Sequence, residues 1–513
     1  MKKRLSGPVL VFFLLLGACT EKAPVVKPPA DAIEVGFLTG LHGITEPCGC
    51  TSHPLGGLDR LASKLEQHSG KGPFAFAVTG ETFFEHDDPP GHLVKQEAAK
   101  AEAIAEILGR LKPAAVVVGE RDLKAGQGRL QRWGKTFNLP LFQPPRNVTT
   151  HFRADHVLRT IGGHKIGFIG LPGVPAPEEA SSMSRGALAL RAQGAELVIA
   201  LLPMGGEDAR AFTRTLNGID IAVGGGVDAE EPPEVVEGTL LVDGGIKGKN
   251  LGLLKVHWVS EPRATKGFVY YDRGEVKRSS LEKRIIQLEN TIDRLAPGAG
   301  KAVRQDKLKV LKKELAAFSP QAPEVPYVTW DRAPVEKKTG SLGWATRRLA
   351  EYNRSLCDIT IASTGDLLCA VASEPADVYV GTARCMGCHV EAHRFYEGTR
   401  HAHAFETLEE AGKNCDLGCI GCHTVGYNEP GGYCRVGDAE ANKNVGCENC
   451  HGPGAGHAGA PYDRDAWSSR FMASPGEAVC KTCHNPEHSD QFDFETYLKK
   501  ILGPGHGAKA EAR

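Results

Sequence analysis

Short apolar runs rich in β-branched residues recur along the first half of the chain, and segments with apolar residues at helical spacing lie between several of them. Such runs predict buried β-strands, and apolar residues repeated every three or four positions predict amphipathic helices. Alternating strands and helices indicate a layered α/β domain, which we assign to 33–260. The predicted strands are 33–39, 74–79, 115–118, 166–171, 197–202, 219–223 and 240–242, and the predicted helices include 58–65 and 97–111.

The pattern changes after this domain. From 276 to 320, apolar side chains recur at helical spacing among Lys, Arg and Glu, with a break at the Pro-Gly pair of 297–298. Two helices separated by such a break predict a helical hairpin or a short coiled coil. The next segment, 326–377, contains one predicted helix at 342–356. Its pattern predicts no domain of its own, so we assign it as a connection to the last region, 378–513.

The N-terminus has the composition of an export signal. Lys2, Lys3 and Arg4 precede an apolar run at 5–16 that is too short for a transmembrane helix. The small residues just before Cys19 resemble the lipobox of bacterial lipoproteins, which implies that 1–19 carries the signal and that Cys19 becomes an acylated membrane anchor. The alternative is a simple signal peptide with an incidental cysteine. The proline-rich segment 20–32 is then expected to be an extended tether.

The lipoprotein resemblance also implies a location at the cell envelope, facing the periplasm or the surface. Thr20, in place of Asp, favours the outer membrane in a cell with two membranes. The net charge of -1, with 24% charged residues, gives no reason to expect binding of nucleic acid.

Four Cys-x-x-Cys-His motifs lie in the last quarter of the chain. In each motif two thiols can form thioether bonds to the vinyl groups of a haem, and the histidine that follows can bind the iron as proximal ligand. Paired cysteines of a zinc site are the alternative, but zinc gives no reason for a histidine directly after every pair. We therefore predict four haem c groups. The attachment residues are Cys385, Cys388, Cys419, Cys422, Cys447, Cys450, Cys480 and Cys483, and the proximal ligands are His389, His423, His451 and His484.

The motifs follow one another closely between Cys385 and His484. So little chain cannot wrap four separate pockets, and the porphyrins must form much of the core of this region and lie close together. Haems at close range conduct electrons, so the spacing predicts electron transfer.

The sequence around these motifs resembles the multihaem cytochromes c that accept electrons from hydroxylamine oxidoreductase. The matching stretches are 388–389 with 399–404, 422–426 with 431–432, and 445–454 with His457. The resemblance implies histidine on both sides of most haem irons, with His401 and His457 as the best distal ligands. Further possible distal ligands are His403, His393, His488 and His506. The family also tolerates a five-coordinate haem, which leaves open a reductase of a small nitrogen or sulfur species.

Six of the 15 cysteines remain after the eight in the motifs and Cys19. An exported protein meets an oxidising environment, in which an even number of cysteines favours disulfides. The nearest pairs in sequence are Cys357 with Cys369 and Cys415 with Cys434, although spacing alone leaves the connectivity open.

The α/β domain resembles the 5'-nucleotidase-type metallophosphoesterases over about 33–259. The stretches that carry the resemblance are 38–43, 55–60, 78–81, 118–122, 220–228 and 249–256. The family binds two metal ions, but Gly40 and Glu81 occupy positions of its metal-binding aspartates, Glu120-Arg121 replaces its Asn-His pair, and 226–228 lacks its late histidines. Hydrolysis by two metals requires both ions, so we predict a fold that has lost this activity. An active phosphoesterase is the alternative.

The remaining two cysteines, Cys48 and Cys50, stand in the loop where the parent fold presents its substrate. A Cys-Gly-Cys sequence suits a redox pair, a pair of soft-metal ligands, or half of a structural disulfide set. The complete prediction is a metallophosphoesterase-like layered α/β sandwich, a helical hairpin and a mainly α/loop tetrahaem region. We expect it to relay electrons between redox partner proteins, such as other cytochromes or a membrane oxidoreductase.

Overall fold

The computed structural model describes most of the chain. Cys19, Cys48, Cys50, Cys369 and His506 lie outside the described residues, as does the late motif at 226–228. The described residues are 32–47, 54–124, 126–142, 155–225, 231–259, 267–272, 275–293, 295, 299–317, 323–364, 373–374, 377–434, 436, 440–459, 475–485, 488–489 and 491–504.

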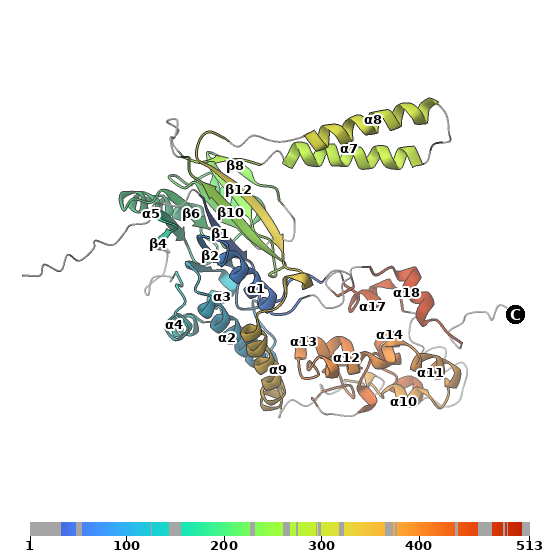
Figure 1. Ribbon diagram of the computed structural model, residues 1–513. Helices are drawn as coiled ribbons and strands as arrows, with labels where there is room; N and C mark the ends of the chain where they lie inside the picture. The colour runs from blue at the N-terminus through green and yellow to red at the C-terminus, as the bar shows by residue number, and fades with distance from the viewer. Residues whose placement is uncertain are drawn as a thin grey trace, which may run out of the picture.

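Two six-stranded mixed sheets form the centre of the α/β domain (Figure 1). The first sheet has the order β11-β12-β10-β1-β2-β3, and the second has the order β4-β5-β6-β7-β9-β8. The strands of the first sheet are β1 (Ala32–Thr39), β2 (Phe74–Gly80), β3 (Ala115–Val118), β10 (Asn250–His257), β11 (Val269–Tyr270) and β12 (Tyr327–Pro334). Those of the second are β4 (Asp155–Ile161), β5 (His164–Gly170), β6 (Leu197–Leu201), β7 (Ile221–Gly224), β8 (Glu234–Val236) and β9 (Thr239–Asp243).

The sheets pack face to face, and helices cover their outer faces. Alternate residues of β6 show why its sequence is apolar throughout: Leu197, Ile199 and Leu201 pack between the sheets, while Val198 and Ala200 pack against helices. The outer helices are α1 (Leu58–Ser69), α2 (Val94–Leu111), α3 (Glu120–Lys124), α4 (Gln127–Thr136), α5 (Ala180–Ala192), α6 (Gly206–Thr213) and α9 (Gly343–Thr364), with short 3₁₀ turns at Pro177–Glu179 and Lys337–Thr339. The predicted α/β class is confirmed.

The segment 326–377, which the sequence pattern assigns only as a connection, completes the α/β domain. Strand β12 pairs with β10 in antiparallel register and with β11 in parallel register. Helix α9 then packs along α2, where Tyr352 and Leu356 meet Ala103. The α/β domain is therefore discontinuous in sequence, and the hairpin is inserted between two of its strands.

The predicted helical hairpin is confirmed. Helices α7 (Glu275–Asp293) and α8 (Ala299–Ala317) pack together through Leu281, Ile285 and Leu311. The pair projects away from both sheets (Figure 1).

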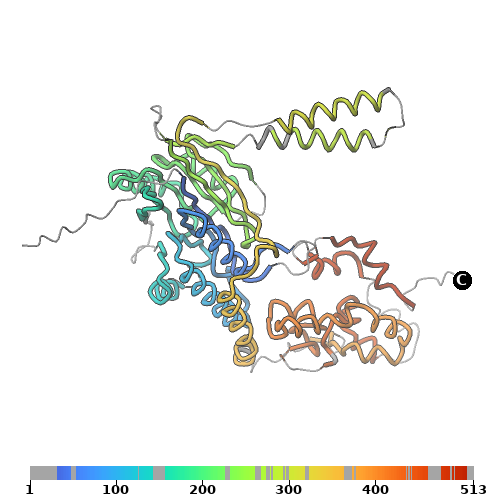
Figure 2. Tube along the Cα trace, in the orientation of Figure 1, coloured from blue at the N-terminus to red at the C-terminus, as the bar shows by residue number. Residues whose placement is uncertain are grey.

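The C-terminal region consists of short helices and loops, as predicted, and lies beside α2 and α9 (Figure 2). Its own apolar cluster is small and includes Phe405, Leu417, Ile420 and Tyr433. No helix among the described residues is long and apolar enough to span a membrane. The helices are α10 (Thr382–Cys385), α11 (Val390–Glu397), α12 (Ala404–Glu410), α13 (Leu417–His423), α14 (Cys447–His451), α15 (Ala455–Ala458), α17 (Glu477–Lys481) and α18 (Phe494–Ile501), with 3₁₀ turns at Arg400–His403 and Glu440–Asn442.

Candidate haem-binding region and its junction with the α/β domain

Each attachment motif lies on or at the end of a short helix. In α13 the motif occupies the last turns, and the Asp416 carboxylate caps the helix by accepting a hydrogen bond from the backbone N–H of Gly418 at 3.1 Å. Because the two cysteines and the histidine stand at positions i, i+3 and i+4, one helical face presents all three side chains. This local geometry suits a planar group held by two thioethers and one imidazole.

Two of the predicted proximal histidines each lie close to a histidine from elsewhere in the sequence. The ring centres of His389 and His457 are 6.1 Å apart, and those of His401 and His484 are also 6.1 Å apart. An imidazole nitrogen binds a metal ion at about 2 Å and lies about 1 Å from its ring centre, so two rings on opposite sides of one metal are roughly 6 Å apart. Both pairs therefore fit coordination of one iron from two sides.

The tautomer of His423 also suits metal binding. Its Nδ1 lies 2.6 Å from the carbonyl oxygen of Ala404, and because a carbonyl only accepts, Nδ1 must carry the proton. The other nitrogen, Nε2, is then left with its lone pair, which is the usual arrangement for a histidine ligand. His484 has a similar contact, from Nδ1 to the Ser489 hydroxyl at 3.2 Å.

Burial and the neighbouring His484 lower the pKa of His401. His403 has a different environment. It is exposed, and its ring nitrogens lie 3.1 Å from Glu406 Oε1 and 3.1 Å from the carbonyl oxygen of Glu397, contacts that raise its pKa. Both ring nitrogens of His403 are thus engaged by protein oxygens, whereas the ring of His401 lies beside that of His484, so the geometry suits His401 better as a ligand.

The structure also describes two of the other candidate distal ligands, His393 and His488. His393 lies on α11, 3.7 Å from the Glu397 carboxylate and beside the Tyr396 ring. His488 is exposed in a turn after the fourth motif.

The attachment cysteines approach one another in pairs. The Cys385 thiol contacts that of Cys447, and the Cys422 thiol contacts that of Cys483. The first motif therefore lies beside the third, and the second beside the fourth. This pairing fits the close haem packing expected from the sequence.

At the carboxyl edge of β1 and β2, an arginine contacts a histidine and a backbone carbonyl. The Arg121 guanidinium donates from Nη1 to His42 Nδ1 at 3.1 Å and to the carbonyl oxygen of Glu85 at 2.7 Å. A fixed positive charge beside the histidine repels a metal cation. No cluster of three or more His, Cys, Asp or Glu side chains that could hold a metal occurs among the described residues.

The nearby carboxylates, Asp122 and Glu81, accept hydrogen bonds from backbone N–H groups. Asp122 is fully buried and accepts backbone N–H donors from 82 to 84, while burial and the adjacent Glu81 raise its pKa to about 7. Burial also raises the pKa of Glu81, which accepts the N–H of Asp122 at 3.3 Å. Glu81 fits because residue 119 is glycine, where a Cβ would lie 2.4 Å from the Glu81 carboxylate.

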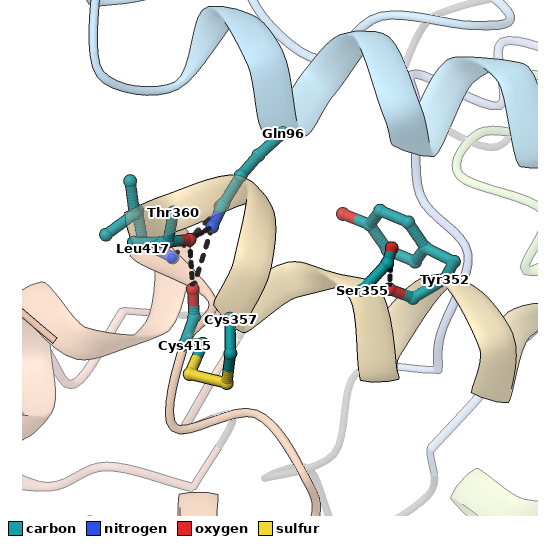
Figure 3. The surroundings of a disulfide bond; sticks show 7 residues. All are labelled: Gln96, Tyr352, Ser355, Cys357, Thr360, Cys415 and Leu417. Carbon is teal, nitrogen blue, oxygen red and sulfur yellow. Dashed lines mark hydrogen bonds between the residues drawn. A yellow bond between two sulfur atoms is a disulfide. The ribbon is translucent and has the colours of Figure 1, made fainter. Parts of the chain in front are cut away.

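The disulfide pairing differs from the nearest pairs in sequence. Cys357 on α9 is bonded to Cys415, just before α13 (Figure 3). Cys434 is also disulfide-bonded, and Cys369 lies outside the described residues. The nearest pairs in sequence, Cys357/Cys369 and Cys415/Cys434, are therefore not formed, because α9 runs beside the haem-binding region and brings Cys357 close to a residue distant in sequence.

Sequence reasoning also missed the polar contacts that join the two regions. The Gln96 side chain on α2 donates to the carbonyl oxygen of Cys415 at 2.7 Å and to the Thr360 hydroxyl, and accepts the N–H of Leu417 at 3.1 Å (Figure 3). Gln96 is 3% exposed although it is polar. One feature of the sequence could have indicated that Gln96 is buried: it lies seven residues before Ala103, on the buried face of the same helix.

Residues 384–452 match the family described as cytochrome c554 and c-prime. The match contains the motifs that begin at Cys385, Cys419 and Cys447, while the motif at Cys480 lies beyond it. It identifies the C-terminal region as a c-type cytochrome region, which implies covalently bound haem c. No curated protein matches the chain.

Solved structures similar to the chain include phosphoesterases, at low identity. A 5'-nucleotidase precursor from Thermus thermophilus is 15% identical, with a TM-score of 0.42, over 79% of this chain and 72% of that chain. The calcineurin-like phosphoesterase YfkN from Bacillus subtilis is 13% identical, with a TM-score of 0.40, over 65% and 99%. The sulfate thiohydrolase SoxB from Thermus thermophilus, in complex with glycerol, is 14% identical, with a TM-score of 0.40, over 69% and 64%. These similarities carry no information on activity.

Proposed function

We propose that the chain is an exported, lipid-anchored tetrahaem c-type cytochrome that relays electrons at the cell envelope. The observation that supports this most is the two pairs of neighbouring histidines, His389 with His457 and His401 with His484, each with ring centres 6.1 Å apart. Histidine on both sides of an iron leaves no position for a substrate, so this geometry favours electron transfer over substrate chemistry.

Haem c supplies one-electron transfer when bound. The chain holds each group by two cysteines and a histidine, and the contacts of Cys385 with Cys447 and of Cys422 with Cys483 bring the attachment sites together two by two. The second motif, on α13, adjoins the α/β domain, because Leu417 and Cys415 contact Gln96. In this proposal, electrons pass between haem groups that are all attached to one polypeptide chain.

The location and the partners follow from the sequence. The signal at 1–19 directs export, and Cys19 anchors the mature chain in a membrane surface, with the outer membrane favoured by Thr20. The redox partners are other cytochromes or a membrane oxidoreductase. Nucleic acid is not a partner.

The α/β domain in this proposal is inactive as a phosphatase and serves docking or thiol redox chemistry. The contact of the Arg121 guanidinium with His42 supports the loss of metal-dependent hydrolysis. Its contacts with the cytochrome region support docking, and Cys48 and Cys50 are the candidates for thiol chemistry. If a purified sample contained two bound Mn or Zn ions per chain and hydrolysed phosphoesters, this part would be wrong.

Haem analysis tests the main proposal. The haem-loaded protein is expected to contain four haem c per chain, and low-temperature EPR of the ferric form is expected to show low-spin iron at the haems of His389 and His484. His457→Ala should convert one haem to high spin, whereas His403→Ala, a histidine two residues from His401 but exposed, should leave the spectrum unchanged. Four low-spin haems in His457→Ala would contradict the ligand assignment.

A reductase with one open haem is the second candidate. It is favoured by one observation: among the described residues, no histidine ring contact is found for His423, in contrast to His389 and His484. A high-spin ferric signal in the unmodified protein, altered by nitrite, hydroxylamine or sulfite, would support this candidate.

A further inference from the structure

The contacts between the two regions converge on the stretch just before the second haem-attachment motif. Cys415 carries the disulfide to α9, and Gln96 of α2 binds the backbone of Cys415 and Leu417. Lys413 reaches both α9 and the loop after β1. This stretch leads directly into α13, which presents Cys419, Cys422 and His423. Among the residues that the structure describes, the second motif is thus the one with the most direct contacts to the α/β domain.

A charged cluster lies at the centre of this junction. The Lys413 ammonium lies 2.9 Å from Glu46 Oε1 and 3.4 Å from Asp416 Oδ2, and donates to Asn353 Oδ1 at 2.9 Å. Asn353 in turn donates to Glu46 Oε1 at 3.0 Å. Lys413 is 8% exposed, so water screens its charge weakly. We call Glu46, Lys413 and Asp416 the junction triad.

The triad acts electrostatically on the attachment site. Burial raises the pKa of the Cys419 thiol to about 12, and among the neighbouring charges Asp416 and Glu46 raise it while Lys413 lowers it. The sulfur no longer titrates once it forms a thioether. The same three charges act at the position of Cys419, where the haem is attached in this proposal, and Asp416 caps the helix that carries His423.

We propose that the junction triad sets the reduction potential of the second haem and couples it to the α/β domain through Glu46. The inference rests on the proposed tetrahaem function and adds where the two regions communicate. Reduction adds one electron to the iron, so a nearby negative charge disfavours the reduced form and a nearby positive charge favours it. Glu46 belongs to the loop after β1, so a change in that loop that moves its carboxylate alters the potential of this haem.

The test is a spectroelectrochemical titration of the full-length, haem-loaded protein. Glu46→Gln removes the negative charge but retains an oxygen that can accept from Lys413 and Asn353. One of the four reduction steps is expected to move to higher potential. At the unmodified midpoint, the ratio of reduced to oxidised iron in that step should rise roughly three- to tenfold, or about 30 to 60 mV at 59 mV per tenfold change.

Two further variants separate charge from packing. Lys413→Gln should move the same step in the opposite direction, to lower potential. Glu106→Gln is the matched control, because Glu106 pairs with Arg348 at 2.5 Å and joins the same helices, α2 and α9, without contact to the junction triad. It should leave all four steps in place.

The proposal is overturned if Glu46→Gln moves no step, moves all four together, or moves the same step in the same direction as Lys413→Gln. The last result would indicate loosened packing rather than charge. Haem content and reversible reduction are measured on the same samples. Four reducible haems with no shift would reject only the coupling, whereas a different haem count would reject the tetrahaem function itself.

Discussion

Buried apolar side chains are plentiful in the α/β domain and scarce in the cytochrome region. Beyond residue 377, the described residues contribute seven buried hydrophobic side chains, and Cys388 is exposed while the other seven attachment cysteines are only partly covered. In the α/β domain, by contrast, β1 and β6 are buried on both faces. The α/β domain is stabilised by its own side chains, whereas we expect the cytochrome region to need bound haem to complete its core.

Removing haem is expected to loosen the cytochrome region and leave the α/β domain unchanged. In protein produced without haem attachment, amides of α10 to α15 should exchange with deuterium roughly 100-fold faster or more, because no bound group then opposes local opening. Amides of β1 and β6 should exchange as slowly as before. Hydrogen–deuterium exchange followed by mass spectrometry measures both, and equal protection of α13 with and without haem would contradict the difference in cores.

A core truncation in the α/β domain should have the converse effect. Phe37 is fully buried between the sheets, with its ring centre 5.9 Å from that of Trp330. Phe37→Ala removes a ring and leaves a cavity, so we expect a loss of about 3 to 5 kcal/mol in the free energy of unfolding of this domain. Denaturant titration followed by circular dichroism measures it. The haem spectra should not change before the domain unfolds, and an early change would mean that the two regions unfold together.

The disulfide between Cys357 and Cys415 links the two regions and spans 58 residues. A cross-link of this span restricts the unfolded chain, so the Cys357→Ser/Cys415→Ser double variant is expected to lose about 2 to 4 kcal/mol in unfolding free energy. Ser355→Ala is the control, since Ser355 lies on the same helix and makes only a local bond to the Tyr352 carbonyl (Figure 3). Equal stability of the double variant and the control would show that Gln96 and Lys413 hold the junction without the disulfide.

The smallest expected effect is a pH dependence confined to the α/β domain. Burial raises the pKa of Asp243 to about 6, against the opposing effects of the Gly245 N–H and Arg332. A raised folded-state pKa means that the contribution of Asp243 to stability is present at acid pH, below its ordinary pKa of 3.8, and is lost as the pH rises through 6. Between pH 4 and 7 we expect this residue to account for a fall of roughly 1 to 3 kcal/mol in unfolding free energy.

Asp243→Asn should flatten that slope in urea titrations across the range. Glu207→Gln, at an exposed carboxylate that pairs with Arg210, should leave the slope unchanged. An unchanged slope in Asp243→Asn would show that this carboxylate is already solvated in the folded protein.

Elements with a strong local pattern were predictable from the sequence. The apolar run at 197–202 corresponds to β6, and the apolar spacing at 276–320 corresponds to α7 and α8. Strand β12 was not predicted, because only its first half is buried and its partner strand β10 lies far away in sequence. Pairing between distant strands leaves no periodic signal in either one.

For the candidate sites, too, features within a short stretch of sequence were predictable, whereas contacts between distant residues were not. The four Cys-x-x-Cys-His motifs were readable because attachment of one haem depends on residues within five positions. The sequence also named His401 and His457, through a family resemblance, but only the fold decided which proximal histidine each one faces.

The α/β class, the hairpin and the haem-attachment motifs could be predicted from the sequence, since each depends on side chains close together along the chain. The bond between Cys357 and Cys415 and the contacts of Lys413 with Glu46 and Asp416 depend on the packing of the folded chain. These contacts join segments brought together by the packing of α9 along α2 beside the cytochrome region. Such proximity follows from burial of the whole chain, which local periodicity does not encode.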